Sequence, residues 1–238
     1  MVVETAHTSR QAAEKHKEAG ARWVIVTSPM EDPDFTAVIG VNNDGLDAER
    51  HRIVSTASHI TASVGPVAAV LDKAAGVNSA VSTTLHAYSA SSGIAELPSD
   101  DLRRTRGDGA NVVPTSTAAS REIAQAFPHL NGSFSATSVR LPVADGSLTE
   151  LVVVLRDAVP AQALNEAFGD AARGMLKGTL SYTEDPIVSR DVLGNASSAV
   201  VDGALTRAFG AHARVFAWSD SEWSYASRIA DTVDLLQY

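Results

Sequence analysis

The sequence predicts an α+β fold, in which helices cover a β-sheet, with a smaller α/β segment at the N-terminal end. Two observations support this prediction. Strand-like apolar runs are interspersed with helical stretches along most of the chain, and 45% of the 238 residues are hydrophobic, which is ample for a core. The length fits one large domain, or one domain with a small appendage.

The N-terminal segment predicts a helix and several short strands. Residues 9–19 combine a plausible cap with polar helix formers and end at Gly20. Trp23 to Val26 form an apolar run typical of a buried strand, and short strands are expected at 35–41 and 53–54. One edge of so small a sheet would have unpaired backbone groups. We therefore expect a rearranged N-terminus or an oligomer contact there.

The rest of the chain predicts a long helix followed by strands and further helices. From His59 to Leu71, apolar side chains recur with the 3.6-residue period of an amphipathic helix, which Pro66 is expected to kink. The stretch from Ser89 to Ser99 is expected to be a surface loop. The later elements are expected as strand 80–85, helix 117–126, strands 134–141 and 148–155, helix 161–172 and strand 213–217.

Composition and charge argue against several classes of function. The net charge of −9 argues against a nucleic-acid partner, because phosphate binding needs clustered Lys and Arg. The chain has no cysteine, so it forms no disulfide, thiolate metal site or thiol nucleophile. The N-terminus lacks a signal-peptide pattern, and no window approaches the roughly 18 apolar residues of a membrane span. We expect a cytoplasmic protein that binds neither nucleic acid nor membrane.

Two motifs connect the chain with a known family. The sequence reads ASHITA at 57–62 and TTLHAY at 83–88. Both resemble active-site motifs of phosphorylating glyceraldehyde-3-phosphate dehydrogenases, and further landmarks follow in the family's order at 113–117, 176–178 and 182–189. The chain is similar to the C-terminal, catalytic domain of that family. The resemblance implies a mixed, largely antiparallel sheet covered by helices.

The resemblance also implies how the chain is divided. Residues 1–57 resemble a remnant of the nucleotide-binding domain, 58–226 the catalytic core, and 227–238 the last helix. No strand, G-x-G-x-x-G turn and helix occurs in the sequence, so we expect most of the NAD-binding domain to be lacking. The last helix could cover the N-terminal sheet, form a subunit contact or lie in the former cofactor groove. Because family members are usually homotetramers, a dimer or tetramer is expected.

Several positions depart from the family pattern. His59 stands where the family has its catalytic cysteine, while His86 stands where it has its general-base histidine. Ser221 replaces an asparagine that holds the nicotinamide carboxamide, and Ala62 replaces an active-site asparagine. These departures predict that the chain is not an NAD-dependent dehydrogenase and uses no cofactor.

His59 and His86 are the expected catalytic residues. Family geometry would place His59 in the first turn of a helix, where the positive potential of the helix end favours a neutral imidazole. A second imidazole nearby would then complete an acid–base pair. In the alternative interpretation, His59 only fills the space of a decayed site. No third ligand accompanies the two histidines, so no metal is expected.

Four further residues are expected to bind an anion. By the resemblance, Ser58, Ser89, Thr117 and Arg140 stand where the family has its phosphate ligands. Arg140 could hold an anion with two parallel hydrogen bonds, or form a buried ion pair instead. Ile60 stands where the family has a phosphate-binding threonine. We therefore expect phosphate binding to be weakened or altered.

Two functions follow as hypotheses. The first is a repurposed non-redox acid/base enzyme, a cyclase, isomerase, dehydratase or hydrolase, that uses His59 and His86 on a small, potentially anionic metabolite. Histidine is a chemically active replacement for a nucleophile, which favours this hypothesis. The second is a catalytically inactive oligomeric scaffold or regulatory subunit, which the many altered site positions favour.

Overall fold

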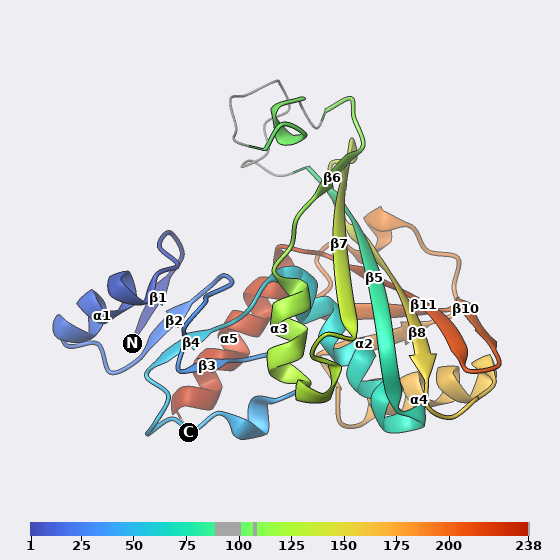
Figure 1. Ribbon diagram of the computed structural model, residues 1–238, viewed down its shortest axis with the longest axis horizontal. Coiled ribbons are helices and arrows are strands. Elements are labelled where there is room, and N and C mark those ends of the chain that lie inside the picture. The colour runs from blue at the N-terminus through green and yellow to red at the C-terminus, as the bar shows by residue number, and fades with distance from the viewer. Residues whose placement is uncertain (89–100, 107–108, 238) are drawn as a thin grey trace.

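The computed structural model describes residues 1–88, 101–106 and 109–237, which form a four-stranded and a seven-stranded sheet (Figure 1). The smaller sheet has the order β1-β2-β4-β3, and its strands pair in parallel. Helix α1 (Arg10–Glu18) connects its first two strands. The strands of this sheet are β1 (Val2–Glu4), β2 (Val24–Val26), β3 (Phe35–Thr36) and β4 (Ile53–Ser55).

The larger sheet has the order β6-β7-β5-β8-β11-β10-β9. Within the described residues, β5/β7 and β9/β10 are its parallel pairs and the remaining neighbours are antiparallel. The prediction of a mixed, largely antiparallel sheet covered by helices is confirmed. The strands are β5 (Val77–Ala87), β6 (Val113–Thr115), β7 (Phe134–Leu141), β8 (Ser147–Leu155), β9 (Leu180–Thr183), β10 (Ala199–Phe209) and β11 (His212–Ser219).

Helices lie against this sheet and between it and the smaller one (Figure 1). They are α2 (His59–Ala75), α3 (Ala119–Ala126), α4 (Ala161–Arg173) and α5 (Trp223–Gln237), with short helical turns at Asn43–Gly45, Arg104–Arg106, Pro128–Leu130 and Ser189–Val192. In the described part of the chain, no helix is long and apolar enough to cross a membrane.

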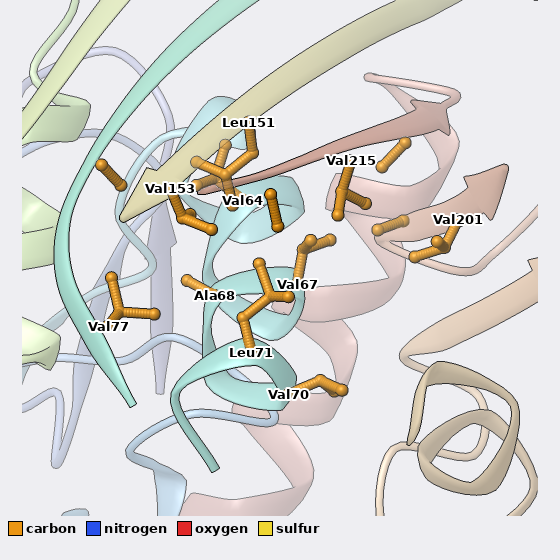
Figure 2. Packing of buried hydrophobic residues seen from close by; sticks show 14 of the residues in the cluster. Val64, Val67, Ala68, Val70, Leu71, Val77, Leu151, Val153, Val201 and Val215 are labelled. Atoms are coloured by element: carbon orange, nitrogen blue, oxygen red, sulfur yellow. The ribbon is translucent and has the colours of Figure 1, made fainter. Parts of the chain in front are cut away.

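Helix α2 supplies the centre of the core. Its valines, alanines and Leu71 face β8, β10 and β11, as the 3.6-residue period predicts (Figure 2). Leu71 is fully buried, and it belongs to the same cluster as Leu151, Val153 and Val215 of the sheet. Pro66 lies inside the helix, which continues to Ala75. This packing fixes the axis of α2 and therefore the place of its first residue, His59.

The last helix covers the small sheet. Leu236 of α5 is 1% exposed and packs in one cluster with Trp23, Ile25 and Val54. Of the three placements considered for this helix, the structure therefore supports contact with the N-terminal sheet. The helix begins at Trp223 rather than at the expected residue 227. The division of the chain into domains at 57 and 226 stays a prediction.

The strand predictions differ from the structure at several points. The strand expected at 35–41 is only two residues long. Strands β1, β6, β9 and β10 were not predicted. Strand β6 contains Pro114, and β10 contains Asp202 and Gly203, which interrupt the apolar pattern. The expected surface loop at 89–99 lies outside the described residues.

Candidate functional site

The turn between β4 and α2 places His59 as the first residue of the helix. Ser58 caps it: the side chain Oγ accepts the backbone N–H of Thr61 at 3.2 Å. Ala57 has a φ of 58°, in the left-handed region that non-glycine residues rarely adopt. Tyr225 of α5 donates its hydroxyl to the carbonyl oxygen of Ala57 at 2.6 Å. Burial raises the pKa of Tyr225, so the phenol keeps its proton and holds the turn.

Glu122 of α3 holds the same end of α2 from another direction. It is 1% exposed, and its Oε2 accepts the Ser58 N–H at 3.2 Å, the Ser58 hydroxyl at 2.7 Å and the Thr61 hydroxyl at 2.6 Å. A carboxylate is favourable here because the helix N-terminus carries positive potential. Our sequence reasoning missed Glu122, since nothing in the local pattern separates it from an exposed glutamate.

His86 and Arg140 face each other on neighbouring strands beside His59. They are register partners in the parallel pair β5/β7. The rings of His59 and His86 meet edge to face, with 5.9 Å between their centroids and an interplanar angle of 76°. Arg140 is 9% exposed. The structure therefore brings together three of the residues that the sequence singled out.

Hydrogen bonds to Ala87 and Ser138 orient the ring of His86. Its Nδ1 lies 2.9 Å from the carbonyl oxygen of Ala87, and its Nε2 lies 2.6 Å from Oγ of Ser138. A carbonyl oxygen only accepts hydrogen bonds, so Nδ1 carries the proton. Our sequence reasoning also missed Ser138. The two-residue period of the strand could have found it, because Ser138 shares the inner face of β7 with Arg140.

A cavity of about 450 Å³ opens beside these residues. A more apolar groove of about 480 Å³ lies between α2 and α4, away from the histidines, and its lining is mostly alanine and other aliphatic side chains. The smaller space is the better candidate because charged and titratable groups converge there. It is lined by the basic residues His59, His86 and Arg140, the acidic residues Asp145, Asp220 and Glu222, and also Ala87, Tyr88, Ala144, Gly146, Ser147, Leu193, Ser221 and Trp223.

Asp220 is occupied in holding the start of α5. Its Oδ1 accepts the backbone N–H groups of Glu222 at 3.0 Å and Trp223 at 2.9 Å. Its Oδ2 accepts the N–H of Gly194 at 2.8 Å. Ser221, the expected replacement for a nicotinamide ligand, shares a hydrogen bond of 2.6 Å with Ser147 across the cavity lining. These bonds fix the segment that leads into α5 and forms one wall of the cavity.

The environment of His59 makes its imidazole neutral. The pKa of His59 is lowered to about 4, mainly by burial and in addition by the neighbouring His86 and Arg140. At pH 7 the ring therefore offers one N–H donor and one acceptor nitrogen. The sequence predicted a neutral His59 from the helix end and from repulsion by a second imidazole, whereas the main cause in the structure is burial.

The other residues expected to bind an anion are not grouped with His59, His86 and Arg140. Ser58 is engaged with Glu122 and Thr61, and the Thr117 hydroxyl accepts the N–H of Ala119 at 3.2 Å. Neither is among the described residues that line the cavity. Ser89 falls outside the described residues. In the part of the chain that the structure describes, no group of three or more His, Cys, Asp or Glu side chains is placed to hold a metal ion.

Comparison with known proteins connects this site with an enzyme family. Residues 58–221 match the model of the glyceraldehyde 3-phosphate dehydrogenase C-terminal domain. The chain belongs to the glyceraldehyde-3-phosphate dehydrogenase family. It is 43% identical over 230 residues to such an enzyme from Kitasatospora aureofaciens, covering 96% of this chain and 69% of that one. It is also 41% identical over 229 residues to the Mycobacterium leprae enzyme, covering 96% of this chain and 67% of that one.

These relatives correct the functional hypotheses drawn from the sequence. A non-redox acid/base enzyme, such as a cyclase or isomerase, was expected, with an inactive scaffold as the alternative. Both expectations are wrong, because relatives at 40% to 43% identity over most of the chain are named glyceraldehyde-3-phosphate dehydrogenases, which are oxidoreductases. The description as a cofactor-independent pseudoenzyme is wrong for the same reason. The relatives support a glyceraldehyde-3-phosphate dehydrogenase function instead.

Proposed function

We propose that this chain serves a glyceraldehyde-3-phosphate dehydrogenase function by binding the phosphorylated aldehyde substrate in the cavity beside His59. The observation that carries the proposal is the meeting of Arg140, His59 and His86 in one cavity of about 450 Å³. Cavities for small ligands usually measure roughly 300–1,000 Å³, so this one suits a compact metabolite.

Arg140 supplies the charge that a phosphate group requires. Arg140 is 9% exposed and lines the cavity, so an anion would meet its charge where water screens the interaction only weakly. A guanidinium can also hold two phosphate oxygens at once. Asp145 and Glu222 line the same cavity and would repel an anion, so we expect the phosphate to bind at Arg140 and away from those carboxylates.

His59 would then recognise the aldehyde end of the substrate. A neutral His59 can donate a hydrogen bond to a carbonyl oxygen or accept one from a hydroxyl. His86 is held in place by Ala87 and Ser138, so its ring forms a fixed part of the cavity wall. The end of α2 does not offer a second anion site, because the carboxylate of Glu122 already lies there.

Two features of the chain bear on its chemistry. The chain has no cysteine, so no thiol adduct of the aldehyde can form on it. The connection from β1 to α1 does not resemble a pyrophosphate cradle either: the N–H groups of Ala6 and His7 are bonded to the carboxylate of Glu4 at 2.7 and 3.0 Å. This connection therefore does not fit the pyrophosphate of a dinucleotide, and no hydride-transfer step follows from it. The proposal concerns recognition of the substrate.

Titration calorimetry with glyceraldehyde 3-phosphate tests this function. Replacing Arg140→Gln should weaken binding by about 10- to 100-fold, because a hydrogen bond to a charged group contributes roughly 1.5–3 kcal/mol. Arg140→Lys should retain part of the affinity, since it keeps the charge but not the planar fork. The control is Arg214→Gln, which removes a cation from β11 whose side chain is 45% exposed. It should leave binding unchanged.

Binding of unphosphorylated glyceraldehyde shows how much of the affinity depends on the phosphate group. If the site recognises phosphate, this compound should bind much more weakly than the phosphorylated form. Equal affinity for both compounds, or equal loss in the Arg140 and Arg214 variants, would contradict the proposal. An assay for NAD reduction with the same substrate, run in parallel, measures whether the chain also supports the oxidation.

We also propose that the chain works as a homo-oligomer, a dimer or tetramer, in the cytoplasm. The support is its membership of a family whose members are usually homotetramers. The outer strands of the larger sheet, β6 and β9, are edges at which further pairing would be possible. Light scattering at several protein concentrations measures the oligomeric state. A monomer at every concentration would contradict the proposed homo-oligomer.

A further inference from the structure

Ser138 is a buried hydroxyl in direct contact with His86. It is 2% exposed, and its Oγ lies 2.6 Å from Nε2 of the ring. In the β5/β7 register, Ser138 pairs with Thr84, two residues before the pair of Arg140 with His86. Ser138 and Arg140 therefore share one face of β7, the face that carries the ring and the cavity.

The hydrogen bonds of the ring define its neutral tautomer. Since the carbonyl of Ala87 can only accept, Nδ1 carries the proton, and the lone pair of the neutral ring lies on Nε2. Ser138 then donates its O–H to that lone pair. The unprotonated imidazole nitrogen has one in-plane lone pair. While Nε2 accepts the hydrogen bond of Ser138, it cannot accept one from a ligand.

A serine next to a histidine nitrogen is also the arrangement of a nucleophile and its base. The position of Ser138 argues against that role. Its side chain is almost fully buried, and it is not among the described residues that line the cavity. The geometry suits orientation of His86 rather than attack on a substrate.

We propose that Ser138 is a positioning residue, which holds His86 as the Nδ1–H tautomer and keeps its Nε2 bound to the protein. A ligand in the cavity then meets a ring of fixed orientation, and its polar groups are recognised by His59 and Arg140. This effect on the ligand rests on the proposed function. The tautomer of His86 does not depend on it and can be measured without ligand.

Nitrogen NMR of the histidine rings tests the inference in the ligand-free protein. The wild type should show a protonated Nδ1 and an unprotonated, hydrogen-bonded Nε2 for His86. In Ser138→Ala, the loss of one ordinary hydrogen bond should shift the tautomer ratio about five-fold toward Nε2–H. Ser138→Thr keeps a hydroxyl and should restore the wild-type ratio. Ser135→Ala is the control, because Ser135 is exposed on the same strand.

Binding of glyceraldehyde 3-phosphate is then measured on the same proteins. Ser138→Ala should weaken it several-fold, while Ser138→Thr and Ser135→Ala should leave it near the wild-type value. A wild-type His86 protonated at Nε2, an unchanged ratio in Ser138→Ala, or a changed ratio with unchanged binding would each overturn the inference. Failure of the wild type itself to bind the ligand would instead overturn the proposed function, and the tautomer measurement would still decide the role of Ser138.

Discussion

The inner face of β8 changes character along its length. Leu151, Val153 and Leu155 are each 1% exposed and belong to the apolar core under α2, whereas Ser147 and Thr149 are buried on the same face beside the cavity. Strand β5 makes the same change: Ala80 lies opposite Val153, while Thr84 and His86 lie opposite Thr149 and Ser147. The two ends have the same backbone pattern but different chemistry.

The difference lies in what holds each end together. At the apolar end, stability comes from surface removed from water and from close packing. At the polar end, hydroxyls are joined in pairs, with 2.9 Å between Thr84 and Thr149 and 2.6 Å between Ser147 and Ser221. Buried polar groups must be hydrogen-bonded in this way, which fixes their positions. The apolar end should therefore dominate stability and the polar end ligand recognition.

The largest effect on stability is expected at the apolar end. Leu71→Ala should lower the free energy of unfolding by about 2–5 kcal/mol, because it leaves a cavity at a fully buried position of α2. Urea unfolding measures the loss. The control Leu205→Ala, at a position 38% exposed, should cost much less. Equal costs for the two variants would contradict the assignment of the core.

A pH-dependent effect is expected at the polar end. The pKa of His59 is about 4 in the folded chain against 6.5 for the unperturbed side chain. As the pH falls from 6.5 to 4, the unfolded chain takes up a proton that the folded chain does not, so stability falls. The contribution is on the order of 3 kcal/mol. His59→Asn should remove this part of the pH dependence.

Urea unfolding of the wild type and of His59→Asn, each at pH 7 and at pH 4.5, measures this pH-dependent part of the stability. His212→Asn, which changes an exposed histidine at the start of β11, is the control and should keep the wild-type pH dependence. A pH dependence that is the same in His59→Asn and in the wild type would show that His59 is not held neutral by burial.

A smaller effect is expected where α3 meets the start of α2. Glu122→Ala leaves the Ser58 N–H and the Ser58 and Thr61 hydroxyls without this acceptor, which should cost about 1–3 kcal/mol. The other carboxylate oxygen, Oε1, is buried with no hydrogen-bond partner among the described residues, which favours the lower part of that range.

Thermal unfolding and amide exchange at Ser58 report the change. Glu166→Ala, an exposed glutamate on α4, is the matched control and should have almost no effect. If Glu122→Ala unfolds at the temperature of the wild type and the amide of Ser58 stays protected, Glu122 does not hold the end of α2.

Elements with a regular pattern were predicted well from the sequence. The strand expected at 134–141 is β7, and the helix expected at 161–172 is α4, which ends one residue later. Strand β10 was missed because Gly203 interrupts it. In the structure, a Cβ at Gly203 would overlap the hydroxyl and ring of Tyr182 on β9, so the glycine allows close packing between the two neighbouring strands. A local sequence pattern cannot distinguish a glycine needed for packing inside a strand from a glycine that ends the strand.

The candidate site was predicted in part. The resemblance singled out His59, His86 and Arg140, and the structure places all three around one cavity. It did not single out Ser138 or Glu122, whose partners lie 52 and 64 residues away in the sequence. The hypothesis of a non-redox function was wrong because it was drawn from departures at single positions, whereas similarity extends over most of the chain.

The sequence alone determined the class of fold, the kinship with glyceraldehyde-3-phosphate dehydrogenases and the exclusion of thiol chemistry, because motifs, periodicity and composition need no partner to be recognised. Only the tertiary structure decided which nitrogen of His86 carries its proton, why His59 is neutral, and which end of β8 is core and which is site. These properties depend on burial and on contacts between residues far apart in the chain. They exist only once β5, β7, α2 and α3 are packed together.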